Sequence, residues 1–225
     1  MSARRLASSQ ISLPVASSEA VAGDLIVPAG AEGIVFFAHG SGSSRRSSRN
    51  RRVAEVLQAR GLATLLFDLL TESEEERDAV SAELRFDIPF LAQRLGDVIA
   101  HVRGRGDVGT LPIGLFGAST GAAAALVAAA EGGRIGAIVS RGGRPDLAAG
   151  WLERVTAPTL LIVGSRDTPV IEMNRSAYER LAAPDKSMVI VPGATHLFEE
   201  PGALEEVARL AADWLGRWLP ASTRA

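Results

Sequence analysis

Two hydrophobic periods alternate along the chain, and their order predicts the class of fold. Short, continuous apolar runs, such as residues 33–38 and 159–163, are typical of strands that are buried on both faces of a sheet. Between these runs lie longer stretches in which apolar residues recur every three or four positions, as they do on one face of a helix. Alternating strands and helices predict a mostly parallel sheet that is covered by helices.

The runs divide into an opening hairpin and six strands, most of them followed by a helix. Residues 11–15 and 21–27 are expected to form an antiparallel hairpin at the sheet edge. The other predicted strands are 33–38, 62–67, 111–116, 135–139, 159–163 and 188–191. The predicted helices are 49–60, 84–103, 120–131, 170–181 and 204–218. The connections are long enough for crossover helices, so we predict a twisted sheet of about eight strands, six of them parallel.

The chain length of 225 residues suits a single α/β domain over 1–225. Residues 1–10 are expected to be a loose N-terminal tail. Only residues 140–157 separate the strand at 135–139 from the next one, which leaves room for a loop and a short helix. We therefore expect no cap domain and an open site.

Composition narrows the function and the environment. Hydrophobic residues make up 47% of the chain, which argues against disorder, and the net charge of −2 favours neither nucleic acid nor an anionic membrane as a partner. The chain has no cysteine, which excludes a disulfide, a thiolate metal site and a cysteine nucleophile. Residues 1–10 contain no apolar signal-peptide core, and the apolar run 122–130 is shorter than the ~20 residues of a membrane-spanning helix. We expect a cytoplasmic protein.

The sequence G-x-S-x-G at residues 117–121 is the first sign of catalytic chemistry. It follows the predicted strand 111–116 and precedes the alanine-rich helix, which is the strand–turn–helix position of a nucleophile elbow. A serine on so tight a turn crowds its neighbours, so the residues two before and two after it must be nearly free of side chain. Gly117 and Gly121 meet this condition, and Ser119 is the candidate nucleophile.

A serine hydroxyl needs a neighbouring base, and the chain offers three histidines. His101 lies within a helical pattern and is expected on the surface. His39 follows the strand 33–38, in the loop that is expected to supply oxyanion donors. His196 lies between the last strand and the last helix, and loops at the carboxyl ends of strands carry the chemistry of α/β sheets. His196 is therefore the candidate base.

An acid that orients the imidazole is expected at another strand end. Asp167 follows the strand 159–163 and would fix the imidazole tautomer. Asp68 also ends a strand but precedes the serine in the chain, which makes it the weaker candidate. The chain order Ser119, Asp167, His196 is the one expected for this type of fold.

These residues resemble those of the α/β-hydrolase superfamily, and most closely the small dienelactone-hydrolase-like serine hydrolases. The likeness covers residues 33–219 and rests on the motifs at 37–40, 117–121, 162–167 and 192–196. Dienelactone hydrolases use a cysteine nucleophile, whereas this chain has Ser119, so a general esterase reaction fits better than dienelactone cleavage. The resemblance implies an oxyanion hole made by the backbone N–H groups of Thr120 and Ser41.

Two groups of arginines allow two interpretations. Arg141 and Arg144 follow a strand on the catalytic edge, and five further arginines lie between residues 45 and 52. Guanidinium groups there would recognise an anionic substrate, and we name Arg141, Arg144 and His39 as tentative substrate-binding residues. The alternative is a solvated surface with internal ion pairs. The possible acidic partners are Glu72, Glu74, Glu75 and Glu76, which are themselves expected on a solvated face.

The predicted function is hydrolysis of a small-molecule ester or thioester through an acyl-Ser119 intermediate. We expect no cofactor and no metal, since the glycine-rich segment 40–44 lacks the Walker lysine and no metal-ligand spacing is present. Two alternatives stay open. One is a non-hydrolytic binding protein on the same scaffold, and the other is an acyltransferase that delivers the acyl group to an alcohol or amine.

Overall fold

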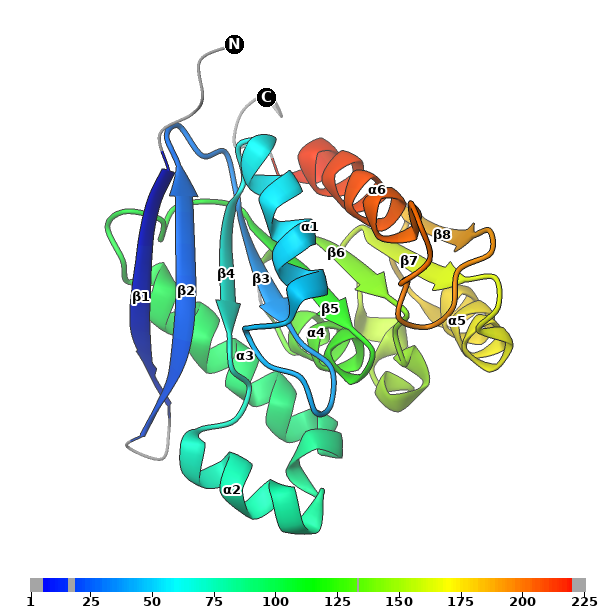
Figure 1. The fold of residues 1–225 in the computed structure, drawn as a ribbon, viewed down its shortest axis with the longest axis horizontal. Helices are drawn as coiled ribbons and strands as arrows, with labels where there is room; N and C mark the ends of the chain where they lie inside the picture. The colour runs from blue at the N-terminus through cyan, green and yellow to red at the C-terminus, as the bar shows by residue number, and fades with distance from the viewer. Residues whose placement is uncertain (1–5, 16–18, 133, 220–225) are drawn as a thin grey trace.

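The computed structural model describes residues 6–15, 19–132 and 134–219. An eight-stranded sheet runs through the molecule in the order β1-β2-β4-β3-β5-β6-β7-β8 (Figure 1). The six strands from β4 to β8 pair in parallel, whereas β1 pairs with β2 and β2 with β4 in antiparallel fashion. The strands are β1 (Leu6–Pro14), β2 (Ala20–Pro28), β3 (Ile34–Ala38), β4 (Ala63–Phe67), β5 (Ile113–Ala118), β6 (Ile135–Arg141), β7 (Thr159–Gly164) and β8 (Lys186–Val191). The prediction of an α/β-hydrolase sheet with six parallel strands is confirmed.

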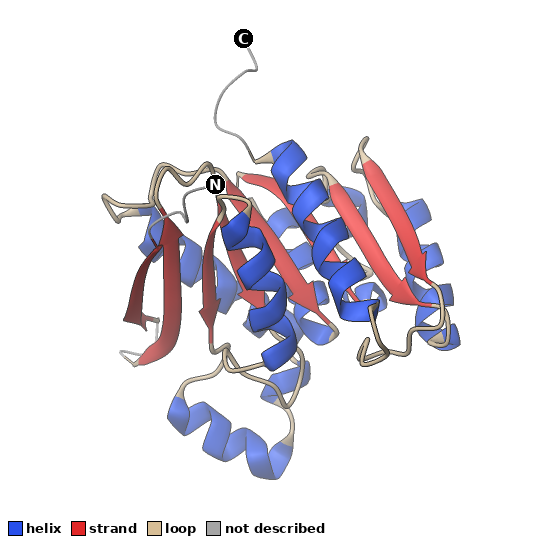
Figure 2. Cartoon of the chain, turned by 45° about the horizontal axis from the view of Figure 1, so that its top comes forward, coloured by secondary structure: helices blue, strands red, loops and turns tan. Residues whose placement is uncertain are grey.

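Helices cover both faces of this sheet, as Figure 2 shows. α1 and α6 lie on one face, and α3, α4 and α5 lie on the other. The α-helices are α1 (Ser48–Ala59), α2 (Glu72–Ser81), α3 (Ile88–Arg103), α4 (Thr120–Ala130), α5 (Thr168–Arg180) and α6 (Ala203–Trp218). The short 3-10 helices are η1 (Leu84–Phe86), η2 (Pro145–Ala148) and η3 (Leu152–Arg154). No helix of the described ranges is both long and apolar enough to cross a membrane.

Each face of the sheet has its own hydrophobic core. Alternate strand residues point to opposite faces, so Phe36 and Leu115 pack with α3 and α4, whereas Phe37 and Phe116 pack with α1 and α6. The central strands β3 and β5 are buried throughout, which explains their continuous apolar runs. The predicted tail is wrong for residues 6–10, because they pair with residues 24–28 in β1 and β2. Residues 1–5 lie outside the described part.

The connection between β6 and β7 contains only η2 and η3, so no cap domain covers the carboxyl edge of the sheet there. A helix that the pattern analysis did not predict, α2, follows β4 and lies below the sheet in Figure 1. Its N-terminus is a capping box, in which Thr71 accepts from the Glu74 N–H and Glu74 accepts from the Thr71 N–H. The spacing T-x-x-E at residues 71–74 was the available sequence signal for this helix.

Candidate active site

Ser119 lies on the turn between β5 and α4 in a backbone conformation that few non-glycine residues adopt, with φ of 52° and ψ of −121°. Strain of this kind persists only where surrounding contacts fix the backbone, and it concentrates at functional sites. Two hydrogen bonds to the loop after β6 fix it here. The Ser119 N–H donates to the carbonyl of Arg141 at 3.2 Å, and the Arg144 N–H donates to the carbonyl of Ser119 at 3.1 Å.

The glycines around Ser119 are required by contact with neighbouring backbone. A Cβ atom on Gly117 would lie 2.4 Å from a backbone atom of α4, and one on Gly121 would lie 2.2 Å from the carbonyl oxygen of Ala38. Across the site, a Cβ on Gly40 would lie 3.0 Å from the Cβ of Ser119. These contacts agree with the steric interpretation of the G-x-S-x-G sequence.

Asp167 and His196 meet at the same edge of the sheet, although 29 residues separate them. Asp167 is the N-cap of α5, directly after β7, and its Oδ2 lies 2.6 Å from Nδ1 of His196. The carboxylate side chain is 13% exposed and the imidazole 37% exposed. Gly164 allows the two loops to approach, since a Cβ there would lie 2.4 Å from the carbonyl oxygen of Ala194. A carboxylate on Nδ1 holds the proton there and leaves Nε2 as the basic nitrogen.

The loop of residues 141–144 lies between the serine turn and the histidine. It contacts Ser119 through the two backbone hydrogen bonds described above, and a Cβ on Gly142 would lie 3.5 Å from Nδ1 of His196. Asn174 anchors the loop by donating to the carbonyl of Gly143 at 2.9 Å. Within the described ranges, no hydrogen bond joins the Ser119 hydroxyl to the imidazole. Catalytic hydrogen bonds are often long without substrate and tighten when it binds.

The two predicted oxyanion donors lie side by side. The N–H of Thr120 belongs to the first turn of α4, where N–H groups have no partner within the helix. The Ser41 N–H, in contrast, donates to Oγ1 of Thr120 at 2.9 Å. A substrate carbonyl oxygen would therefore have to share or replace this contact in order to use the Ser41 donor.

His39 is buried and is held by backbone groups at both ring nitrogens. Its Nδ1 donates to the carbonyl of Gly40 at 3.0 Å, and its Nε2 accepts from the N–H of Leu69 at 3.1 Å. These partners require the neutral Nδ1–H tautomer. Burial lowers the pKa of His39, against the raising effects of the Gly40 hydrogen bond and of the carboxylates of Asp68 and Glu75. A substrate-binding role of His39 stays a prediction, and the observed contacts anchor the loop that carries Ser41.

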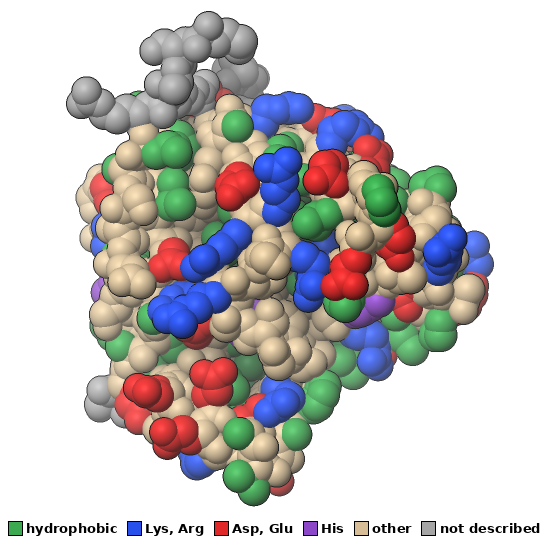
Figure 3. Space-filling view, viewed as in Figure 1, with side chains coloured by type: hydrophobic (Ala, Val, Ile, Leu, Met, Phe, Trp, Pro, Cys, Tyr) green, Lys and Arg blue, Asp and Glu red, His purple; other side chains and the backbone are tan. Residues whose placement is uncertain are grey.

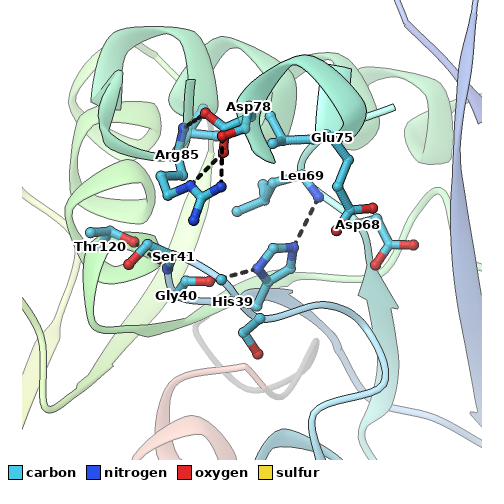
Figure 4. A pocket seen from close by; sticks show the side chains of 13 residues that line it. His39, Gly40, Ser41, Asp68, Leu69, Glu75, Asp78, Arg85 and Thr120 are labelled. Atoms are coloured by element: carbon cyan, nitrogen blue, oxygen red, sulfur yellow. Dashed lines mark hydrogen bonds and ion pairs between the residues drawn. The ribbon is translucent and has the colours of Figure 1, made fainter. Parts of the chain in front are cut away.

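A pocket opens beside this loop, as Figure 4 shows. Ser41 and Thr120 form one side of it, and His39 and Leu69 form its base. On the α2 side lies Arg85, a lining residue that the sequence analysis missed. Its guanidinium donates to the side chain and to the backbone carbonyl of Asp78. The pocket therefore adjoins both predicted oxyanion donors.

Most of the arginines at residues 45–52 are paired with carboxylates, and basic and acidic side chains alternate over this surface (Figure 3). Arg45 pairs with Asp68, so the Asp68 carboxylate is bound to a guanidinium and Asp167 contacts the imidazole of His196. Further ion pairs join Arg51 to Asp24, Arg49 to Glu199 and Arg52 to Glu55, and two longer ones join Arg45 to Asp24 and Arg52 to Glu205. Internal pairing thus describes this cluster, although its partners are not the glutamates of residues 72–76.

Glu74 is buried, although it was expected on a solvated helix face. It is 5% exposed and accepts two hydrogen bonds from the guanidinium of Arg94, at 2.8 and 2.9 Å. Arg94 also donates to the carbonyl of Leu69 at 3.1 Å. Burial alone would raise the pKa of Glu74, but the hydrogen bonds from Arg94 and Thr71 lower it. The expectation is wrong for Glu74 because the capping box turns its side chain inward towards α3.

The two arginines after β6 differ from each other. Arg144 forms a two-pronged ion pair with Asp146, at 2.7 and 2.9 Å, which occupies one edge of its guanidinium. Arg141 is 7% exposed, and no hydrogen bond or ion pair of its side chain is present in the described part of the chain. Its guanidinium lies 5.9 Å from the ring centre of Phe198. In residues 6–15, 19–132 and 134–219, no group of three or more His, Asp or Glu side chains could hold a metal ion.

The parallel sheet, the serine elbow and the Asp–His pair at its carboxyl edge define an α/β-hydrolase. A model of the family described as "PETase: PET hydrolase-like" matches residues 42–225, and the chain belongs to this family. It has the fold of an α/β-hydrolase.

Solved structures extend this result. A dienelactone hydrolase from Anabaena variabilis is 55% identical, with a TM-score of 0.92 over 95% of this chain and 99% of that one. The Pyrococcus furiosus esterase Pf2001 shares the fold at 20% identity, with a TM-score of 0.75 over 95% of this chain and 94% of that one. The resemblance to dienelactone-hydrolase-like proteins is confirmed.

A relative from Mycobacterium tuberculosis has a different type of name. It is called "Putative phosphoribosyl transferase" and is 59% identical over 202 residues, which are 89% of this chain. The match covers 44% of the relative, so the chain spans less than half the length of this curated relative.

Proposed function

We propose that the protein is a serine esterase in which Ser119 is the nucleophile, His196 the general base and Asp167 the residue that orients the base. The observation that carries this proposal is the combination of a strained Ser119 turn with the 2.6 Å contact between Asp167 and Nδ1 of His196. Both features lie at the carboxyl edge of the sheet and are joined by the loop of residues 141–144. A serine hydroxyl becomes an effective nucleophile when such a base accepts its proton.

The proposed reaction has two steps, acylation of Ser119 and deacylation by water. In the first, Oγ of Ser119 bonds to the ester carbonyl carbon while Nε2 of His196 accepts the hydroxyl proton. The tetrahedral intermediate collapses, and the proton passes to the departing alcohol or thiol, which leaves an acyl-serine. In the second, water bonds to the acyl carbon and gives its proton to His196. The bond between the acyl carbon and Oγ of Ser119 then breaks, His196 returns the proton to Oγ, and the acid leaves. Asp167 stabilises the imidazolium in both steps.

The N–H groups of Thr120 and Ser41 are the proposed oxyanion donors. Their position supports this role, since both adjoin Ser119 and line the pocket beside it. The negative charge develops at the N-terminus of α4, where the free N–H groups of a helix favour an anion. As the carbonyl oxygen becomes an oxyanion it is a stronger acceptor than a neutral hydroxyl, which favours transfer of the Ser41 N–H from Thr120 Oγ1 to the substrate.

The name of the M. tuberculosis relative does not change this proposal. The serine elbow and the Asp–His pair are accounted for by acyl transfer to water, whereas phosphoribosyl transfer has no evident use for them. More than half of that relative has no counterpart in this chain. We propose that phosphoribosyl transfer, if it occurs there, belongs to the unmatched part.

The test is covalent labelling combined with turnover. A fluorophosphonate should label Ser119 at one equivalent per chain, as peptide mass spectrometry would show. Hydrolysis of p-nitrophenyl acetate should fall by at least about 10³-fold in Ser119→Ala, in keeping with the loss of a nucleophile from a triad. Ser187→Ala, in β8, is the control and should keep full activity. Label on another residue, or equal turnover by Ser119→Ala and the parent, would overturn the assignment.

A further inference from the structure

Arg141 carries a buried positive charge next to the proposed site. Side chains of β6 alternate between the two faces, and Arg141 follows Ala137 and Val139 on the face of α1 and α6. Its guanidinium lies over the ring of Phe198, which is itself 1% exposed. Burial of a cation is strongly unfavourable unless an anion or several hydrogen-bond acceptors compensate it.

No such compensation comes from the described protein groups. Within the described residues, the side chain of Arg141 has no carboxylate or carbonyl partner, and its Nε–H is buried without an acceptor. Buried polar groups in proteins are almost always hydrogen-bonded, so a buried donor without an acceptor points to a functional role. The phenyl ring of Phe198 offers a weak attraction that does not replace an anion.

A second cation increases the demand for an anion. Arg49, near the start of α1, lies close enough to disfavour the charge on Arg141. Burial, with this smaller effect of Arg49, lowers the pKa of Arg141 to about 10, so the group stays protonated at neutral pH. The Nε–H of Arg49 is also buried without an acceptor, although its Nη1 donates to Glu199. The guanidinium groups of Arg49 and Arg141 therefore each have a buried Nε–H without an acceptor.

This region adjoins the reacting groups. The carbonyl of Arg141 accepts from the N–H of Ser119, and the next residue, Gly142, packs against the imidazole of His196. Phe198 follows His196 by two positions in the same loop. An anion bound by the Arg141 guanidinium would thus lie on the side of the loop that carries His196 and Phe198, and Arg141 does not line the pocket of His39 and Ser41. Arg144 cannot offer the same site without giving up its pair with Asp146.

We propose that the guanidinium of Arg141 binds an oxyanion, a carboxylate or a phosphate, that the ester substrate carries on the His196 side of the nucleophile. This inference rests on the proposed esterase function and names its substrate class. The unpaired, planar guanidinium suits two-pronged recognition of either oxyanion. The anion would supply the counter-charge that the fold omits, and a neutral ester would leave the buried cation unpaired.

The first experiment compares two esters with the same acyl chain. Mono-p-nitrophenyl succinate carries a free carboxylate, and its methyl ester does not. The parent enzyme should prefer the anionic ester in kcat/KM by at least tenfold. Arg141→Met should reduce this preference by about 10- to 100-fold, the range expected for hydrogen bonds to a charged group. Arg154→Met, an exposed site with the same change in net charge, should keep the preference.

A binding experiment separates this inference from the esterase proposal. Thermal shifts with inorganic phosphate and with monomethyl succinate, each against chloride at constant ionic strength, distinguish the two oxyanions. A shift in the parent that is absent in Arg141→Met and partly retained in Arg141→Lys supports the site, even if no ester is cleaved. Equal rates on both esters together with equal shifts in parent and Arg141→Met would overturn it, while Ser119-dependent turnover would still support the esterase.

Discussion

Two buried arginines lie on opposite sides of Ser119, the proposed nucleophile, and only Arg94 has a hydrogen-bonded partner among the described residues. Arg94, in α3, is 4% exposed and is held by Glu74 and by the carbonyl of Leu69. Arg141, at the end of β6, is 7% exposed and has no such partner in the described residues. Burial and charge are nearly equal in the two. The two differ in whether the guanidinium has hydrogen-bonded partners within the protein. We interpret the partnered Arg94 as structural and the unpartnered Arg141 as a binding residue.

The Arg94 side forms a continuous network that ends at the proposed oxyanion loop. Glu74 binds Arg94, Arg94 binds the carbonyl of Leu69, and the N–H of Leu69 binds His39. His39 in turn donates to the carbonyl of Gly40, next to Ser41. Every link is a hydrogen bond within the protein, so this side is complete before a substrate arrives. The Arg141 side becomes complete only with an added anion.

The largest expected effect comes from breaking the satisfied pair. Arg94→Met removes the partner of Glu74 and leaves a buried carboxylate alone, and such changes cost about 3–5 kcal/mol of unfolding free energy. Urea unfolding at neutral pH measures this loss. The double variant Arg94→Met, Glu74→Leu removes both charges and should recover much of the stability. A single variant that loses less than about 1 kcal/mol would show that the pair is not structural.

Acid sensitivity of His39 is the next effect in size. Its folded pKa is lowered, so the unfolded chain binds a proton more readily, and stability falls as pH drops below the unfolded value of about 6.5. The difference of one bound proton between the unfolded and folded states changes the unfolding free energy by at most ~1.4 kcal/mol per pH unit.

Unfolding of the parent and of His39→Gln between about pH 7 and 5 tests this. The glutamine variant should lose less stability on acidification than the parent does. His101→Gln, at an exposed site, should behave like the parent. Identical slopes in the parent and His39→Gln would contradict a neutral, buried imidazole.

The sequence could predict a residue's role where the signal lies within one short segment. It could not do so where the role depends on a contact between segments that are distant in the chain. The elbow at 117–121 and the position of Asp167 and His196 after strands could be predicted, because strand ends and small-residue spacing are properties of short segments. The pairing of Arg94 with Glu74 could not, since it joins residues 20 positions apart across two helices. Arg141 and Arg144 looked equivalent in sequence, and only the contact of Arg144 with Asp146 distinguishes them.

The edge strand shows the same limit. Residues 6–10 carry only one large apolar side chain, Leu6, and are mostly exposed even within β1. An exposed edge strand gains its order from hydrogen bonds to its neighbour and has little hydrophobic periodicity. Residues 6–10 therefore lack the hydrophobic pattern that would distinguish a strand from a tail. The helix α2 was not predicted for a similar reason, since its hydrophobicity is low and its main sequence signal is the capping box at its start.

A smaller loss of stability is expected from substitution of Thr120. Thr120→Val keeps the shape but removes Oγ1, so the Ser41 N–H loses its acceptor and stability should fall by about 1 kcal/mol. If the backbone N–H groups are the oxyanion donors, kcat/KM on p-nitrophenyl acetate should change by less than about threefold. Thr120→Ser, which retains the hydroxyl, is the control. A loss of more than about 10²-fold in the valine variant would assign catalysis to the hydroxyl.

The smallest expected effect on stability completes the comparison of the two arginines. Arg141→Met makes the same substitution as Arg94→Met, but it removes a buried charge that leaves no protein partner behind. The unfolding free energy should therefore stay within about 1 kcal/mol of the parent or rise, because replacing buried ionic groups with apolar ones of similar size is often neutral or stabilising. Urea unfolding in a phosphate-free buffer measures this, since a bound anion would stabilise the parent alone. A loss of about 3 kcal/mol, as expected for Arg94→Met, would mean that protein groups already stabilise the Arg141 guanidinium, which would contradict its proposed role in binding an anion.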